Sequence, residues 1–192
     1  MATTDKASTR DRLLDAAADL FYSEGVSVGI EALCRTAGVS KRSMYQLFAG
    51  KDEVLAASLE RRIPLYEEQL SPAAAAAADA TPRERILRVF ERMEYFSTLP
   101  EYRGCPFLAA LVELKDPEHP ASVVAGAAKD RLEATFRAEA ELGGARDARL
   151  LARQLMLVFD GASARAGSRI ETLDDGLATT TVTLLLDAAG VG

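Results

Sequence analysis

Apolar residues recur along this chain at the spacing of α-helices, not at the alternate spacing of strands. The first such stretch has apolar side chains at i, i+1, i+4, i+7 and i+8, namely Leu13, Leu14, Ala17, Leu20 and Phe21. These positions share one helical face, which predicts a helix over 9–24 that ends at Gly25. Alternating β-branched residues never persist for the length of a strand. The pattern therefore predicts an all-α fold.

The same periodicity, interrupted by glycine and proline, predicts about nine helices in all. The eight that follow the first are expected over 30–37, 41–48, 51–70, 82–98, 105–115, 121–142, 147–167 and 173–189. The fifth has the clearest start, because Thr81 can cap it, Pro82 suits its first turn and Glu84 completes a capping box. The alanine-rich segment 72–80 fits either a helix or a loop, and both alternatives stay open.

Two of these helices, 30–37 and 41–48, are short and are joined by the tight turn "AGVS". Such a pair is typical of a helix-turn-helix motif, and Ser40 is a good N-cap for its second helix. Helical spacing predicts that three apolar side chains of this helix face the core: Met44, Leu47 and Phe48. It places a polar set on the opposite side: Lys41, Arg42, Tyr45 and Gln46, with Ser43 at their flank.

This polar set has the chemistry to contact DNA. An arginine can bond a guanine edge in two places, a glutamine can do the same to adenine, and lysine or tyrosine can hold phosphate oxygens. Lys51 and the free N–H groups that begin the helix over 51–70 offer a further phosphate anchor. The alternative is an ordinary solvated face, and the charges alone leave both interpretations open.

Charge and composition exclude several classes of function. The net charge of −6 argues against a general nucleic-acid coat, but residues 1–51 carry +1 and residues 52–192 carry −7, so only the first quarter would not repel phosphates. The single histidine, His119, and two distant cysteines, Cys34 and Cys105, argue against a metal site. No cofactor is expected. No apolar run approaches the length of a bilayer span and the N-terminus lacks a signal-peptide core, so a cytoplasmic protein is expected.

The run "RLLDAAADLFYSEGVS", followed by "IEALCRTAGVSKRSMYQLFAGKDEVLAASL", resembles the N-terminal domain of TetR-family transcriptional regulators. The shared motif comprises an aromatic closing the first helix, Gly25, "AGVSK", Tyr45, Phe48, Lys51 and a following acid. The segment "YRGCPFLAALVELKDPEHP" is similar to the sixth-helix region of one AcrR-like branch. The resemblance implies a three-helix DNA-binding domain over 1–51 and a larger helical domain over 52–192 that binds a small effector and dimerises.

Position by position, the resemblance implies that four residues face the major groove: Lys41, Arg42, Ser43 and Gln46. It implies that Tyr45 and Lys51 contact phosphates. The chain departs from the family pattern at Gly29, where a Thr or Ser commonly caps the second helix and touches the DNA backbone. Glycine caps tolerably but has no hydroxyl to offer a phosphate. Two alternatives stay open: Ser27 takes over that contact, or the contact is absent.

In the larger domain the last two helices, 147–167 and 173–189, are the most apolar. One carries a stripe of Leu150, Leu151, Leu155, Val158 and Phe159, and the other a stripe of Leu177, Thr181, Leu184 and Leu185. These stripes fit interior packing or a four-helix subunit interface, and the resemblance favours the interface of a homodimer.

Nine side chains are candidates for an apolar effector site: Phe90, Met93, Phe96, Tyr102, Cys105, Phe107, Leu111, Met156 and Phe159. Tyr102, Arg92 and Glu113 are candidates for its polar contacts. Plain core packing is the alternative for each apolar member. Cys105 begins a helix, which lowers the pKa of a thiol, so a redox or electrophile sensor and a buried structural cysteine are both open.

The sequence leaves three classes of function to consider. The first is a dimeric repressor that binds a near-palindromic DNA operator and is released by a small, largely apolar effector. The second, an all-α enzyme, lacks paired catalytic side chains and a Gly-rich phosphate loop, so no enzymatic activity is expected. The third is a helical adaptor that keeps a reader-like N-terminal domain but binds protein.

Overall fold

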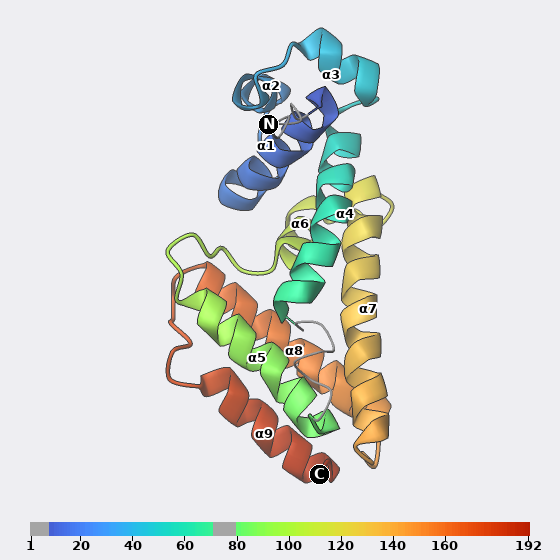
Figure 1. The fold of residues 1–192 in the computed structure, drawn as a ribbon, viewed down its shortest axis with the longest axis vertical. Helices are drawn as coiled ribbons and strands as arrows, with labels where there is room; N and C mark the ends of the chain where they lie inside the picture. The colour runs from blue at the N-terminus through green and yellow to red at the C-terminus, as the bar shows by residue number, and fades with distance from the viewer. Residues whose placement is uncertain (1–7, 71–79) are drawn as a thin grey trace, which may run out of the picture. The chain divides into compact units, whose positions relative to one another are not determined.

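The computed structural model describes residues 8–70 and 80–192, which fold into helices joined by short connections and contain no strand (Figure 1). The helices are α1 (Thr9–Glu24), α2 (Ile30–Ala37), α3 (Lys41–Leu47), α4 (Lys51–Leu70), α5 (Pro82–Ser97), α6 (Pro106–Leu114), α7 (Pro120–Leu142), α8 (Ala148–Gly167) and α9 (Leu177–Ala189). The all-α prediction is confirmed for the described residues. Segment 72–79 lies outside them, so the alternatives stated for it stay open. None of the described helices is long and apolar enough to cross a membrane.

The chain divides into two compact units. Unit 1 holds residues up to Ile63 together with Ala109–Gly126, and unit 2 holds Pro64–Leu108 and Ala127–Gly192. The boundaries fall inside α4, α6 and α7, so each of these helices contributes residues to both units. The division of function between residues 1–51 and 52–192 stays a prediction.

Unit 1 is built on the first four helices. Its core holds fully buried side chains from each of them, which are Leu13, Leu33, Met44 and Leu55. Polar contacts on the surface tie α4 to α1: the Arg61 guanidinium pairs with Asp11 at 3.1 Å and with Asp15 at 3.0 Å. These contacts hold α4 against α1.

Unit 2 is centred on three phenylalanines from three helices. The Phe90 ring of α5 stacks on Phe136 of α7, with centroids 5.6 Å apart, and meets Phe159 of α8 edge to face at 6.1 Å. All three are fully buried. Aromatic pairs with these separations add to the free energy gained from burial itself.

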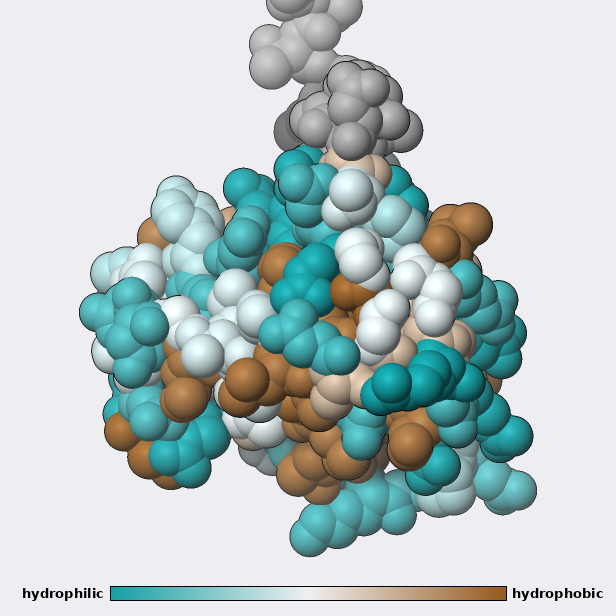
Figure 2. All heavy atoms as spheres, turned by 90° about the horizontal axis from the view of Figure 1, so that it is seen from below, coloured by the Kyte–Doolittle hydropathy of each residue, from teal (hydrophilic) through white to brown (hydrophobic). Residues whose placement is uncertain are grey.

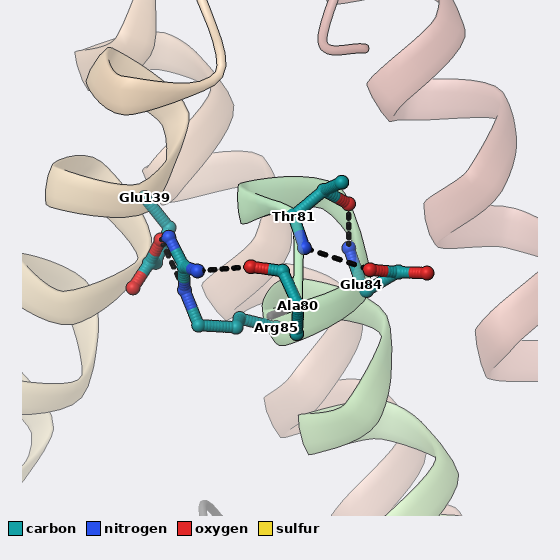
Figure 3. Close-up of polar contacts among 5 residues, drawn as sticks. All are labelled: Ala80, Thr81, Glu84, Arg85 and Glu139. Atoms are coloured by element: carbon teal, nitrogen blue, oxygen red, sulfur yellow. Dashed lines mark hydrogen bonds and ion pairs between the residues drawn. The ribbon is translucent and has the colours of Figure 1, made fainter. Parts of the chain in front are cut away.

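The start of α5 follows the sequence pattern closely (Figure 3). The Glu84 N–H donates to the Thr81 hydroxyl at 3.2 Å, and the Thr81 N–H donates to a Glu84 carboxylate oxygen at 2.7 Å, so the predicted capping box is confirmed. The Thr81 backbone N–H, followed by its side chain, lowers the pKa of the Glu84 carboxyl group by hydrogen bonding to it. Beside them, Arg85 donates to the Ala80 carbonyl and pairs with Glu139 of α7 at 2.7 Å.

The beginning of α9 differs from the prediction. The helix starts at Leu177 and not near 173, because Gly176 adopts a left-handed conformation with φ of 75°. Its first N–H groups are satisfied by a buried carboxylate from α5: Glu94 accepts from Ala178 at 2.8 Å and from Thr179 at 3.0 Å. A carboxylate at this end also interacts favourably with the helix dipole.

Two glycines allow the loop before α6 to touch α8. A Cβ added at Gly167 would lie 2.6 Å from the Arg103 carbonyl carbon, and one added at Gly104 would lie 2.8 Å from the Ser163 carbonyl oxygen. Gly104 also has a φ of +88°, which disfavours any other residue. The adjacent Cys105 is buried.

Candidate nucleic-acid interface

The turn between α2 and α3 is set by its own sequence. Gly38 ends α2 in the left-handed conformation, with φ of 64°, and its N–H returns to carbonyls of the last helical turn. Ser40 then begins α3, because its hydroxyl accepts a hydrogen bond from the Ser43 N–H at 3.0 Å. The predicted N-cap is confirmed, and the short turn holds the two helices against one core.

Two of the three side chains expected to anchor α3 do so. Met44 and Phe48 are buried, but Leu47 is 41% exposed, so its predicted core position is wrong. The helix ends at Leu47, and Phe48 has extended backbone angles of −142° and 140°. Leaving the helix lets the Phe48 ring enter the core and removes Leu47 from it. The Arg10 guanidinium lies 5.4 Å from the centre of that ring.

The polar residues of α3 lie where helical spacing puts them. Lys41, Arg42, Tyr45 and Gln46 are exposed and are called the outward face below; Ser43 is half-buried, and its hydroxyl lies 2.9 Å from that of Ser40. Within residues 8–70 and 80–192, the side chains of Arg42 and Gln46 have no hydrogen bond or ion pair. These two groups, which suit guanine and adenine edges, are therefore available to a ligand.

Lys41 is not available in the same way. Its ammonium lies 2.6 Å from a carboxylate oxygen of Glu31, in the first turn of α2. This hydrogen bond raises the pKa of Lys41 and lowers the pKa of Glu31. One of the two adjacent cations of α3 is thus paired with an acid before any ligand arrives. The sequence gives no signal for the pair, since its members are ten residues apart on different helices.

Lys51 holds the turn between α1 and α2. Its ammonium donates to the Val26 carbonyl at 2.8 Å, while the Val26 N–H donates to Glu113 of α6, also at 2.8 Å. The C=O group of Val26 is therefore hydrogen-bonded to a basic side chain, and its N–H group to an acidic one. An ammonium has three donors, so Lys51 keeps capacity for a further acceptor. Glu113, a candidate for effector contact, instead occupies this place in unit 1.

The start of α4 is more acidic than a simple phosphate anchor. Asp52 and Glu53 stand in its first turn, and Glu53 accepts a hydrogen bond from the Ala49 N–H. The His119 ring nitrogen Nε2 lies 3.5 Å from Asp52. His119 also caps the start of α7, because its Nδ1 accepts from the Ala121 N–H at 3.1 Å. These carboxylates therefore offset part of the positive potential that the free N–H groups give this end of α4.

Gly29 is the N-cap of α2 and supplies no side-chain hydrogen bond. Its backbone angles of −79° and 153° are open to any residue. A Cβ added there would meet nothing within 4 Å. The site therefore lacks a hydroxyl although it has room for one.

Most of the effector candidates lie in the core of unit 2. Phe90, Met93, Cys105, Phe107, Met156 and Phe159 are buried, while Phe96 and Tyr102 are half-buried. Leu111 belongs to unit 1. Phe107 packs edge to face on Tyr66 at 5.2 Å, and the Ser163 hydroxyl donates to the Met93 sulfur at 3.5 Å. Arg92 lies 5.0 Å from the centre of the Phe96 ring and donates to the Gln69 carbonyl.

The last two helices each keep an apolar face exposed. On α8, Leu151, Leu155 and Phe159 are buried but Leu150 is exposed, so the expected stripe is divided between two faces. Leu157 of α8 is 75% exposed and Leu184 of α9 is 65% exposed. Interior packing therefore does not account for these leucines. Figure 2 views the end of unit 2 where α9 finishes and shows apolar side chains gathered between hydrophilic ones.

Residues 13–58 match the family described as bacterial regulatory proteins, tetR family. The HTH-type transcriptional regulator SrpR of Pseudomonas putida is 40% identical over 65 residues, which are 33% of this chain and 30% of SrpR. The uncharacterized HTH-type transcriptional regulator TtgW of Pseudomonas putida is 38% identical over 65 residues, 48% of its length. The chain thus matches less than half of either relative.

Solved structures are similar over nearly the whole chain. A putative TetR transcriptional regulator from Streptomyces avermitilis is 56% identical, with a TM-score of 0.93, covering 97% of this chain and 100% of that one. SCO4454, a TetR-family transcriptional regulator from Streptomyces coelicolor, is 28% identical with a TM-score of 0.81, covering 95% and 96%. The similarity therefore extends well beyond the N-terminal motif.

Proposed function

The chain belongs to the TetR family of transcriptional regulators, and from this premise we propose that it is a dimeric repressor that binds a near-palindromic DNA operator and is released by a small, largely apolar effector. Such a regulator works where the chromosome lies, so the proposed location is the cytoplasm. The observation that carries the proposal is the outward face of α3, whose Arg42 and Gln46 are exposed and have no partner within residues 8–70 and 80–192.

The outward face fits a division of labour on DNA. Arg42 and Gln46 have the bidentate chemistry that distinguishes bases, so they are proposed to read the major groove beside Lys41 and Ser43. Tyr45, which is 54% exposed, and Lys51 are proposed to contact phosphates. The burial of Met44 and Phe48 supports this assignment, because it fixes the side of α3 that remains outside.

The proposed dimer uses the exposed faces of α8 and α9. Leu150 and Leu157 lie on one and Leu177 and Leu184 on the other, at spacings that keep each pair on one side of its helix. Two helices from each subunit would then bury these leucines in a four-helix arrangement. A two-fold dimer presents two α3 helices, which suits half-sites one helical turn, or a multiple of it, apart.

The proposed effector contacts lie on the aromatic side chains of unit 2. Phe90, Phe136 and Phe159 form its apolar centre, and Lys129 lies 5.0 Å from the centre of the Phe159 ring. Lys129 also pairs with Asp160, and its side chain is largely buried. An apolar effector with one polar group is proposed to contact these residues, and its binding requires the packed rings to move apart, because all three are fully buried.

A binding-site selection with random duplexes, followed by fluorescence anisotropy on the selected sequence, tests the proposal. Arg42→Ala should alter the base preferred at one position, by about 1–3 kcal/mol. Arg137→Ala removes an exposed arginine of α7 and should leave the preference unchanged. No binding to any duplex at low salt would overturn the proposal and favour a protein-binding adaptor. An unchanged preference with Arg42→Ala would refute base reading by that residue.

A further inference from the structure

We propose that Glu31 is a specificity-determining residue of the DNA interface. Its carboxylate pairs with the Lys41 ammonium, so this ammonium contributes little to the binding of non-specific DNA. The proposal rests on the proposed function, because it concerns how the outward face of α3 meets a duplex. Glu31 lies on α2, outside the helix that carries the reading residues.

The pair is a product of the turn between the two helices. Glu31 is the second residue of α2 and Lys41 is the first of α3, and their charged atoms lie 2.6 Å apart. Both side chains are more than half exposed, so a duplex lying on α3 would meet the pair directly. Among the charged neighbours of Glu31, Arg35 on α2 also acts on its carboxylate.

The two adjacent cations of α3 therefore differ in what they offer to DNA. Arg42 has no polar partner within residues 8–70 and 80–192 and presents its full charge. Lys41 and Glu31 together present no net charge. Non-specific affinity comes from the number of phosphates that a protein neutralises and the counterions that they release. A paired lysine contributes little to that number, and its carboxylate partner is repelled by nearby phosphates.

A specific sequence can still use Lys41. The ammonium has three N–H donors, and Glu31 takes one of them, so another can reach a guanine O6 or N7 without breaking the pair. The carboxylate also fixes the lysine side chain before binding, which reduces the rotamer entropy that the contact would cost. Glu31 is therefore expected to weaken binding to arbitrary sequences more than binding to the operator.

The pair can be removed without endangering the fold. Exposed ion pairs contribute little to stability, and Glu31 is neither a cap nor a core residue. Glu31→Gln keeps the size of the side chain and removes its charge. Glu60→Gln, at an exposed glutamate of α4, makes the same change in net charge elsewhere in unit 1 and serves as the control. Thermal unfolding followed by circular dichroism checks that both variants are folded.

The experiment measures Kd by anisotropy on the selected operator and on a scrambled duplex, between 50 and 200 mM salt. In Glu31→Gln the scrambled duplex should bind more tightly, and the slope of log K against log salt should steepen by about 0.9. That change alone amounts to about a threefold larger loss of affinity across this salt range. The ratio of operator to scrambled affinity should fall by a similar factor.

A double-mutant cycle separates the pair from general electrostatics. In a Lys41→Gln background no ammonium is left to release, so Glu31→Gln should change the slope by less than it does when Lys41 is present. The assignment is overturned if wild-type protein binds its operator but Glu31→Gln changes neither slope nor ratio, or changes them no more than Glu60→Gln. Glu31→Ala repeats the test if the glutamine variant does not fold. Absence of binding by the wild type would instead refute the proposed function, and this assignment with it.

Discussion

Gly29 begins α2 without a side chain, at a point where the structure leaves room for one. The family pattern usually has a hydroxyl at this place, so the chain is expected to make one phosphate contact fewer. Since the backbone already has the extended conformation of an N-cap, a serine can be introduced there without strain. The missing contact can therefore be restored and its value measured.

We predict that Gly29→Ser raises affinity for all duplexes equally, by about 1 kcal/mol or about fivefold in Kd, because one hydroxyl is added opposite a phosphate. The stability of unit 1 should rise by only a few tenths of a kcal/mol. Gly29→Ala adds the Cβ without the hydroxyl and is the matched control. Anisotropy on operator and scrambled duplexes checks the prediction. An equal gain with alanine would show that the hydroxyl is not responsible.

The contacts that position the helices join residues at very different separations in the sequence. The capping box of α5 is local, and so it was predictable from three residues. The start of α9 differs from the prediction because Gly176 is left-handed and the first N–H groups of the helix are satisfied by Glu94, which lies on another helix 84 residues earlier. Leu47 was assigned to the core because spacing alone does not reveal that α3 ends there.

The candidate site shows the same limit. The outward face of α3 follows from helical spacing, and the structure bears out its exposure. The partners of its charges do not follow, because Glu31 meets Lys41 only through the geometry of the turn and Glu113 reaches Val26 across 87 positions. Sequence patterns reveal helical periodicity and the residues that begin or end a helix. They do not report which distant side chains share a contact.

The capping box of α5 makes the stability of the protein depend on pH. Hydrogen bonds from Thr81 lower the pKa of Glu84 below its usual 4.5 in the folded protein. The ionised form is thus favoured by folding, so its contribution is full above pH 4.5 and is lost as pH falls through the lowered folded pKa. We predict that Glu84→Gln, which can keep the cap, flattens the fall of stability between about pH 5 and pH 3. Urea unfolding at several pH values measures this, with Glu91→Gln, at an exposed glutamate of the same helix, as the control. Parallel curves for Glu84→Gln and wild type would contradict the prediction.

The contact between the 103–104 loop and α8 predicts opposite effects of alanine substitution at two helical glycines. Gly167→Ala should destabilise the protein by about 1–3 kcal/mol, because its Cβ would lie 2.6 Å from the Arg103 backbone. Gly126→Ala, inside α7, has open space around its Cβ and should instead gain up to about 1 kcal/mol of helix propensity. Denaturant midpoints compare the two variants. Equal stabilities would show that the backbones are not in close contact.

For the whole molecule, the exposed leucines of α8 and α9 predict the state of association. We expect Leu157→Glu to raise the dissociation constant of the dimer by about tenfold or more per subunit, because it places a charge where the proposed dimer would bury an apolar side chain. Leu65→Glu makes the same change at a leucine of α4 that is 66% exposed, and it should leave the dissociation constant of the dimer unchanged. Sedimentation equilibrium measures both variants, and a dimer of undiminished strength in Leu157→Glu would exclude α8 from the interface.

The attachment of Val26 to Glu113 and Lys51 also provides an intrinsic reporter. The Val26 amide hydrogen is bonded to the Glu113 carboxylate and not to a helical carbonyl, so the neighbouring helices do not protect it from solvent. Its exchange for deuterium therefore requires that Glu113 release it. The exchange rate at this one amide then measures how often the Glu113 side chain releases the α1–α2 turn. No external label is needed, and the same signal can be followed as DNA or candidate effectors are added.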